Sequence, residues 1–187
     1  MKIANRTWLI SDTHFGHKNI IKFQARPESH EVIMLSNWIK YVGEEDDILH
    51  LGDVFMGKQG NPERWAAVVS RLPGRKYLIL GNHDKPESDL YAKAGFTIIP
   101  EFIRKGVAFT HRPISVEFPG PSRGSTGIGV EWWHTNIHGH THQNIMRPSN
   151  DPTEHDGHLI PGKTYINVCV EITDYKPVQV GNVCPLS

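Results

Sequence analysis

The sequence predicts an α/β fold in which two packed mixed sheets are flanked by helices. Two observations lead to this prediction. Short apolar runs alternate with amphipathic stretches in the first half of the chain, and runs of strand type dominate after residue 96. With 187 residues, of which 38% are hydrophobic, the chain is long enough for one ordinary α/β core and too short for two. We therefore expect a single domain spanning residues 1–187.

Five short apolar runs are interpreted as buried strands, because they are rich in aliphatic and aromatic residues and too brief for helices. They cover residues 7–10, 48–51, 77–80, 107–109 and 135–137. A polar cluster follows each of them. In open α/β sheets, ligand sites gather beyond the carboxyl ends of strands, where several loops converge. We therefore expect the five clusters to lie together in space.

Three amphipathic stretches between these strands predict helices. They cover residues 28–41, 61–71 and 85–94. Ser29 is a possible N-cap and Gly43 a stop signal for the first helix. Pro62 would occupy the first position of the second helix, where proline is well tolerated.

The polar clusters hold enough carboxylate, amide and imidazole groups for two adjacent divalent metal ions. Residues two apart in an extended segment face the same side, so Asp12 and His14 can share one site. The same spacing relates His140 and His142. Asn82 and His83 are neighbours whose side chains diverge, so we expect Asn82 to face a metal and His83 to face the substrate.

Ligand chemistry limits the metals without selecting one. Neutral imidazoles suit transition metals, whereas carboxylate and amide oxygens suit harder ions, so a mixed set fits several divalent cations. Manganese, iron, zinc and nickel are all compatible with it. Metal-assisted hydrolysis of a phosphate ester is the reaction that such a site favours.

Together the clusters resemble the pattern of the calcineurin-like metallophosphoesterases. That pattern reads Asp-x-His, Gly-Asp, Gly-Asn-His-Asp/Glu, His and Gly-His-x-His, and every element occurs here in order. The resemblance runs from about residue 7 to 142, and the apolar run 164–172 resembles the closing strand of the family. Five matches in register form a highly specific signal. The resemblance implies a four-layer α-β-β-α sandwich.

The resemblance also implies a dinuclear metal centre. Its first ion would be held by Asp12, His14, Asp53 and His142. Its second would be held by Asp53, Asn82, His111 and His140, so that Asp53 bridges the pair. Two such ions lie roughly 3.5–4 Å apart and clamp the phosphate oxygens. The implied activity is hydrolysis of phosphate esters by metal-activated hydroxide.

Further residues near the clusters are candidates for contact with the substrate. The resemblance makes His83 the group that protonates the leaving oxygen or stabilises charge in the transition state. Asp84 beside it is expected to fix the tautomer of that imidazole and raise its pKa. Arg112, His17 and Arg26 are tentative substrate-binding residues, with surface ion pairs or structural hydrogen bonds as the alternatives.

Other residues carry weaker signals. His50 is expected to orient a ligand, His138 to support a turn, and Cys169 to be a small buried residue. Side chains expected to be solvated are His30, His134, His155 and His158. Trp132 and Trp133 are expected to contribute to the core, with base stacking as the alternative, and the loops 119–129 and 147–162 are candidate walls of a substrate cleft.

Charge and composition limit the partners. Twenty basic residues balance 20 acidic ones without a basic run, which argues against a general nucleic-acid binder. A nucleotide, a short single-stranded end or a small organophosphate is the expected substrate. The absence of a signal peptide and of a transmembrane segment predicts a cytoplasmic protein that does not bind membranes.

Three classes of function are compatible with these features. The first is a phosphoesterase, with a diester slightly favoured over a monoester because no capping domain is evident. The second is an interaction protein that keeps the fold without catalysis; complete ligands together with His83 argue against it. The third is a metal-dependent hydrolase of another bond, such as an amide, which the Asp53 and Asn82 ligand pattern resembles less.

Overall fold

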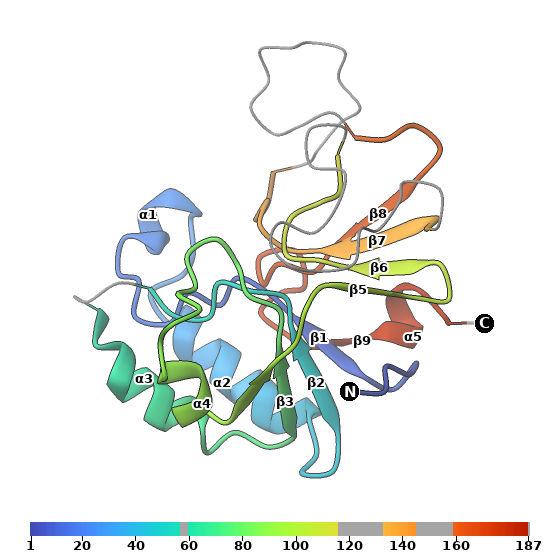
Figure 1. Cartoon of the computed structure of the whole chain (residues 1–187). Helices are drawn as coiled ribbons and strands as arrows, with labels where there is room; N and C mark the ends of the chain where they lie inside the picture. Colours follow the sequence, from blue (N-terminus) through green and yellow to red (C-terminus); the bar gives the residue numbers. More distant parts are fainter. Residues whose placement is uncertain (57–59, 116–132, 145–158, 187) are drawn as a thin grey trace.

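The computed structural model describes residues 1–56, 60–115, 133–144 and 159–186, which form two β-sheets and their flanking helices (Figure 1). The first sheet has the strand order β4 (Phe96–Ile98), β3 (Arg75–Leu78), β2 (Asp47–His50), β1 (Trp8–Ile10) and β9 (Val178–Gln179). The second has the order β5 (Phe102–Arg104), β6 (Val107–Phe109), β7 (Thr135–His138) and β8 (Thr164–Asn167). Strands β9 and β5 run antiparallel to their neighbours and the other pairs are parallel, so both sheets are mixed.

Helices cover the face of the first sheet that points away from the second sheet (Figure 1). They are α2 (His30–Tyr41), α3 (Pro62–Val69) and α4 (Leu90–Lys93). Two further helices are short. Helix α1 (Ile20–Phe23) lies in the connection between β1 and α2, and helix α5 (Val180–Val183) follows β9 directly. The predicted arrangement of two mixed sheets flanked by helices is confirmed.

Alternation along the strands divides the core into layers. In β1, Leu9 points between the two sheets and Ile10 points toward the helices. Strand β2 alternates in the same way, with Leu49 between the sheets and Ile48 under the helices. Successive side chains of a strand point to opposite faces, so an uninterrupted apolar run serves two cores at once. This is why the predicted strands lacked a polar alternation.

Most element boundaries fall within two residues of the prediction. Pro62 opens α3 as expected, and Asn61 before it caps the helix by accepting a hydrogen bond from the Arg64 amide. Ser29 stands at the N-cap position of α2, although its side chain makes no capping hydrogen bond. The third predicted helix is shorter than expected and begins only at Leu90, because the residues before it form a turn in which the Ser88 amide donates to Lys85 O.

The predicted closing strand is shorter than expected for a structural reason. Strand β8 pairs with β7 only as far as Asn167. Beyond it the chain crosses to the first sheet, where Cys169 bridges to Ser11 and the Val170 amide donates to Ser11 O. The segment 168–171 therefore joins the two sheets and brings Glu171 to the ends of their strands.

Several single-residue expectations are settled by burial. Trp133 is 2% exposed and packs on the second sheet, and Cys169 is fully buried, as predicted. His134 is exposed as predicted, but His30 is 3% exposed, so its predicted solvation was wrong. His30 begins α2, where its Nδ1 hydrogen-bonds Pro27 O at 2.9 Å. The expectations for Trp132, His155, His158 and the loops 119–129 and 147–162 lie outside the described residues, apart from the last residues of the second loop.

In the part of the chain that the structure describes, no helix is long and apolar enough to cross a membrane.

Packing between the sheets is expected to dominate stability. Ile137 in β7 is fully buried between them, so Ile137→Ala should lower the free energy of unfolding by about 2–5 kcal/mol. Ile98 on edge strand β4 is 42% exposed, and Ile98→Ala should change the free energy by about 0.5 kcal/mol or less. Urea denaturation of both variants measures this difference. Equal effects would contradict the assigned inter-sheet core.

Candidate metal centre

The predicted polar clusters converge at the carboxyl ends of the strands. Asp12 and His14 follow β1, Asp53 follows β2, and His111 follows β6. Backbone hydrogen bonds hold the clusters together: the Asp12 amide donates to Gly52 O, and the Gly139 amide donates to His111 O. The local pattern of the sequence thus becomes one site shared by the two sheets.

Two groups of side chains at this site can each hold a metal ion. One group consists of Asp12, His14 and His142, and the other consists of Asp53, His111 and His140. In each group the candidate ligand atoms lie within 4.8 Å of one another. Both groups take residues from both sheets. All six residues are ligands that the sequence predicted.

Asp53 lies between the two groups. Its Oδ2 is 3.5 Å from Nε2 of His111 and 3.7 Å from Nε2 of His14. Its other oxygen, Oδ1, accepts a hydrogen bond from the His83 amide at 2.9 Å. The carboxylate is therefore fixed by one oxygen while the other faces a ligand of each group. Asn82 lies on the same side, with Oδ1 2.9 Å from Nε2 of His111.

The unpartnered atoms of the site fit divalent cations. Asp12 Oδ1 and both ring nitrogens of His14 are buried and lack a hydrogen-bond partner in the described ranges. Buried polar atoms without partners are costly, and a bound cation would satisfy an oxygen and an imidazole nitrogen together. The mixture of carboxylate, amide and imidazole donors suits a transition-metal ion.

Hydrogen bonds to Nδ1 orient two of the imidazoles. His111 Nδ1 lies 2.7 Å from Leu51 O, and His142 Nδ1 lies 2.9 Å from Glu171 Oε1. Because a carboxylate oxygen only accepts, Nδ1 of His142 carries the proton and its Nε2 keeps a lone pair for a metal ion. His111 has an acceptor oxygen at both ring nitrogens, since its Nε2 lies 2.9 Å from Asn82 Oδ1, so these contacts fix the orientation of the ring.

Close backbone packing fixes the ligands in strained conformations. Five candidate ligands have positive φ, namely Asp12 (57°), His14 (47°), Asp53 (58°), His140 (69°) and His142 (50°). Such conformations are uncommon for residues other than glycine and concentrate at functional sites. The glycines of the motifs serve the same packing, since a Cβ at Gly81 would overlap Asp53 Oδ1.

Burial and neighbouring charges shift the pKa values of the ligands in different directions. Burial alone would raise the pKa of Asp12, but His111, His14 and His142 hold it well below its ordinary value. Burial raises the pKa of Asp53 to about 6. Burial lowers the pKa of His140 to about 3, so this ring is a neutral ligand at neutral pH.

His83 lies beside the first group and is open to solvent. Its ring centroid is 5.7 Å from that of His14, and the residue is exposed, whereas His14 is 2% exposed. Asn82 and His83 diverge as the sequence suggested, since the Asn82 amide oxygen lies against His111. His83 thus lies on the solvent-exposed side of the site, and its contact with a substrate stays a prediction.

Asp84 has a different role from the expected contact with the His83 ring. Its Oδ2 accepts from the amides of Asp53 at 2.7 Å and Gly81 at 2.8 Å, and its Oδ1 accepts from the Val54 amide at 3.2 Å. The carboxylate is 6% exposed and ties together the loops that follow β2 and β3. Asp84 therefore supports the backbone of the site and does not orient His83.

Arg26 also differs from the expectation of contact with substrate. Its side chain is 0% exposed, and its donors are used by Glu171, Thr13 O and Asp12 O. A guanidinium that is fully buried and bound to these partners is not accessible to a substrate oxygen. The expected substrate contact is replaced by an internal one.

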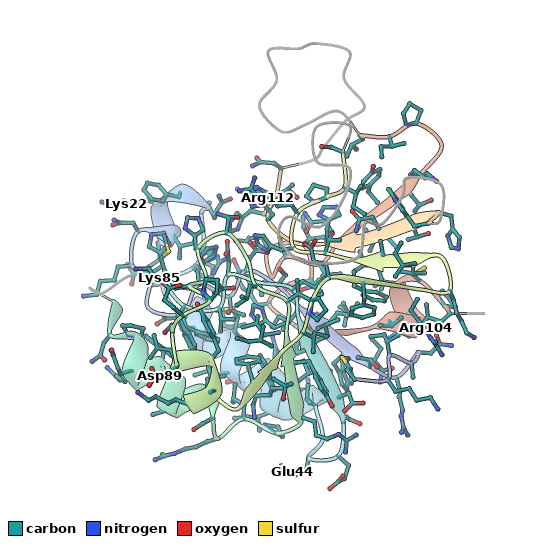
Figure 2. All side chains as sticks on the ribbon, in the orientation of Figure 1. Lys22, Glu44, Lys85, Asp89, Arg104 and Arg112 are labelled. Atoms are coloured by element: carbon teal, nitrogen blue, oxygen red, sulfur yellow. The ribbon has the colours of Figure 1, made fainter. Side chains whose placement is uncertain are left out.

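His17 and Arg112 lie at the rim of the site. The His17 ring centroid is 5.8 Å from that of His14, and burial lowers the pKa of His17. Arg112 follows His111 directly, and its charge contributes to the lowered pKa of His140, after burial and His111. Figure 2 places Arg112 on the same side of the molecule as Lys22 of α1, far from Glu44 at the opposite ends of the strands. Contact of His17 and Arg112 with a substrate stays a prediction.

Two further histidines support the loops of the site. His50 is fully buried, with Nε2 3.0 Å from Thr13 Oγ1, and its Nδ1 accepts from the Gly52 amide at 3.1 Å. It thus contacts the residues beside Asp12 and Asp53 and not the ligand side chains. His138 supports its turn as expected, through Nδ1 and Gly139 O at 2.8 Å.

Three residues of the site were missed by sequence reasoning. Glu171 binds His142, the Ser11 hydroxyl donates to Asp12, and Glu101 Oε1 accepts from the His111 amide at 3.1 Å. Ser11 lies directly before a ligand, which was an available signal. Glu171 was the one acidic residue in the apolar run 164–172, and a charge within a buried strand is a further available signal. Glu101 stands in a connection between strands and gave no signal.

The fold and this arrangement of ligands match a known family. The model of the calcineurin-like phosphoesterases matches residues 5–162. The chain belongs to the calcineurin-like phosphoesterase family.

One relative and one solved structure match the chain over most of its length, and a further relative matches less than half of it. An uncharacterized protein of Methanocaldococcus jannaschii is 30% identical over 185 residues, which cover 97% of this chain and 90% of that protein. Gene 66 protein of Mycobacterium phage L5 is 36% identical over 85 residues, covering 44% of this chain and 41% of that protein. The crystal structure of a protein of unknown function from Aquifex aeolicus has a TM-score of 0.65 at 29% identity and covers 92% of this chain and 94% of that chain.

Metal affinity is expected to fall in acid. Because the pKa of Asp53 is raised to about 6, a cation must displace its proton below that pH, at a cost of about tenfold in affinity per pH unit. Burial alone would lower the pKa of His142, but the Glu171 hydrogen bond together with the charges of Asp12 and Glu171 raises it, which adds a second proton in the same direction. Affinity should therefore rise with pH and become constant once both groups are deprotonated.

Calorimetric titration with Mn²⁺ between pH 5 and pH 8 measures this dependence. His140 contributes little to it, because its pKa of about 3 lies below the range. Equal affinities at pH 5 and pH 7 would contradict the assignment of Asp53 as a ligand.

Proposed function

We propose that this protein is a metal-dependent phosphoesterase that hydrolyses phosphodiesters of nucleotide type. Two divalent ions would be held, one by Asp12, His14 and His142, the other by His111, His140 and Asn82, with Asp53 shared. When bound, such ions supply charge for the phosphate oxygens and lower the pKa of water. The observation that carries the proposal is the Asp53 carboxylate, whose Oδ2 lies within 3.7 Å of a histidine Nε2 in each group.

The exposed imidazole of His83 supports a catalytic role for the site. His83 is held by its own amide, which donates to Asp53 Oδ1, while its ring stays accessible next to His14. A ring in this place can donate a proton to a leaving oxygen or stabilise charge on the reacting phosphate. General acid catalysis of this kind contributes about 10²–10⁴ in rate. An interaction protein without catalysis would have no need for this accessible histidine.

An exposed aromatic ring near the site favours a nucleotide-like substrate. Phe23 of α1 is 67% exposed, and its centroid lies 6.0 Å from the His17 ring. His17 in turn lies 5.8 Å from the ligand His14. An open aromatic face next to a phosphate site can stack a nucleobase, and stacking tolerates every base. Lys22 in the same helix adds a positive charge for a neighbouring phosphate.

The balanced charge of the chain limits the size of this substrate. With 20 basic and 20 acidic residues, the protein lacks the excess of positive charge that extended duplex binding requires. We therefore propose a nucleotide or a short single-stranded end as the partner, with a phosphomonoester as the alternative substrate.

Comparing two chromogenic esters tests the proposed function. Metal-stripped protein reloaded with Mn²⁺ should hydrolyse bis-p-nitrophenyl phosphate faster than p-nitrophenyl phosphate. The variant His83→Ala should keep its bound metal and lose about 10²–10⁴ in kcat, because only the proton donor is removed. Metal content is measured in parallel by atomic emission.

Each other outcome changes the proposal in a defined way. Faster cleavage of the monoester would replace the diesterase by a phosphatase. Absence of metal-dependent turnover with both esters would refute the phosphoesterase assignment for these substrates. Loss of metal in His83→Ala would show that His83 is a ligand and not the proton donor.

Replacing Phe23 tests the preference for a nucleobase. Phe23→Ala should raise KM for the p-nitrophenyl ester of thymidine 5′-monophosphate about tenfold, because stacking contributes about 1–3 kcal/mol per base. KM for methyl p-nitrophenyl phosphate, which has the same leaving group and no base, should not change. Phe23→Trp should keep the low KM.

The control for this experiment is Ile39→Ala. Ile39 is 62% exposed on α2 and is not aromatic, so it offers no ring for stacking. Equal changes of KM for both esters in Phe23→Ala would remove Phe23 from the proposed base site.

A further inference from the structure

Arg26 and Glu171 form a buried ion pair beside the group Asp12, His14 and His142. Their side chains are 0% and 4% exposed, and Nη2 of Arg26 lies 2.6 Å from Glu171 Oε1. Nε of Arg26 donates to the same oxygen at 2.8 Å. The two charges cancel, so the pair adds a carboxylate acceptor without adding net charge to the metal centre.

Both members of the pair contact the metal-binding group directly. Glu171 Oε1 accepts from Nδ1 of His142 at 2.9 Å. Arg26 donates from Nη2 to Asp12 O at 2.7 Å and from Nη1 to Thr13 O at 2.9 Å. Thr13 lies between the ligands Asp12 and His14. The pair therefore holds the ring of one ligand and the backbone that joins the other two.

His142 depends on this contact for its orientation. A neutral imidazole carries one proton, and a carboxylate at Nδ1 keeps that proton away from Nε2. Nε2 of His142 lies 3.9 Å from Asp12 Oδ1, the unpartnered oxygen of the group. His14 has no such support, because neither of its ring nitrogens has a hydrogen-bond partner in the described ranges. The hydrogen bond that His142 donates to Glu171 thus orients one imidazole of this group.

The second group is oriented in a different way. Nδ1 of His111 in that group lies 2.7 Å from Leu51 O, which is a neutral backbone carbonyl. Among the described residues, the hydrogen bonds of Arg26 and Glu171 reach Asp12, Thr13 and His142 but none of the ligands Asp53, His111 and His140. Removing the pair should therefore affect one group and leave the other as an internal reference.

We infer that Glu171 and Arg26 are positioning residues for the Asp12–His14–His142 group alone. Glu171 keeps the proton of His142 on Nδ1, so that Nε2 is available to a divalent cation. Arg26 fixes Glu171 and holds the Asp12–Thr13 backbone in place. This inference rests on the proposed binding of metal at the site. It predicts that a change in the pair lowers the metal affinity of the Asp12–His14–His142 group and leaves the affinity of the other group unchanged.

Mn²⁺ titration followed by electron paramagnetic resonance tests the inference. Glu171→Gln keeps the size of the side chain and a carbonyl acceptor for Arg26, so the fold is expected to persist. Glu171→Gln is combined with His111→Ala, in which only the Asp12–His14–His142 group is intact. It is also combined with His14→Ala, in which only the Asp53–His111–His140 group is intact. Glu171→Gln should weaken Mn²⁺ binding about 10- to 100-fold in the His111→Ala background, the usual effect of losing the partner of a ligating histidine. It should leave the affinity unchanged in the His14→Ala background.

A second readout needs no metal. Imidazole ¹⁵N shifts of the metal-free protein at pH 8 report which nitrogen of His142 carries the proton. The parent protein should show the Nδ1-protonated form, and Glu171→Gln should shift His142 toward the Nε2-protonated form, because the neutral amide oxygen of glutamine, which also accepts from Arg26, holds the Nδ1 proton less strongly than a carboxylate does. Glu45→Gln is the matched control, since Glu45 pairs with Arg75 at 3.1 Å on the surface with its side chain 94% exposed. It should change neither readout.

The outcomes separate this inference from the proposed function. Equal loss of affinity in both backgrounds would assign the pair a general structural role and overturn the inference. If Glu171→Gln left the Mn²⁺ affinity unchanged in the His111→Ala background, the inference would be overturned as well. The proposed function would stand in that case, because the parent protein would still bind metal. Failure of the parent protein to bind Mn²⁺ would overturn the proposed function together with the inference.

Discussion

The site depends on three backbone hydrogen bonds to the buried carboxylate of Asp84. They come from the amides of Asp53, Val54 and Gly81 and hold the loops after β2 and β3 against each other. Asp53 gains its place between the two ligand groups only because these loops touch, and the absence of a side chain at Gly81 leaves room for its Oδ1. A buried carboxylate is costly unless it accepts several hydrogen bonds, and these amides meet that condition. The Asp84 carboxylate is not itself a candidate metal ligand, but its hydrogen bonds position the candidate ligand Asp53.

This arrangement requires several candidate ligands to adopt a positive backbone angle φ, which is a strained conformation for residues other than glycine. Asp12, His14 and Asp53 all have φ between 47° and 58°, in loops that directly follow strands. Such loops turn sharply, so that a side chain leaving a buried strand points across the edge of the sheet. The surrounding contacts must over-determine conformations of this kind, and Arg26 and His50 provide such contacts on either side of Thr13. The polar residues around the ligands thus hold strained loops in place.

Local patterns predicted those parts of the molecule that depend on neighbours in the chain. The strands and the convergence of the polar clusters at the strand ends follow from local patterns, and the two ligand groups follow from the family resemblance. Spacing alone paired His140 with His142, whereas the structure places them in different groups, because both residues have positive φ and are not extended. Contacts between distant residues were not predictable in this way. Arg26 and Glu171 are 145 positions apart, and the sequence around neither residue indicates that the two form a pair. Asp84 was assigned to His83 because it is adjacent in sequence, although its hydrogen bonds reach back to Asp53 and Val54. His30 was expected in solvent because it matched no ligand spacing, whereas the structure buries it at the start of α2.

Each ligand group draws residues from both sheets, and this has a consequence for the fold as a whole. Asp12 and Asp53 leave the first sheet, while His111 and His142 leave the second, so a cation held between them would be a cross-link between two layers that otherwise meet through apolar side chains. Loading of the site and docking of the sheets then become one coupled equilibrium. A ligand at 100 times its dissociation constant adds about 2.7 kcal/mol to the stability of the state that binds it. The concentration of free metal would therefore contribute to the free energy of unfolding of both sheets together.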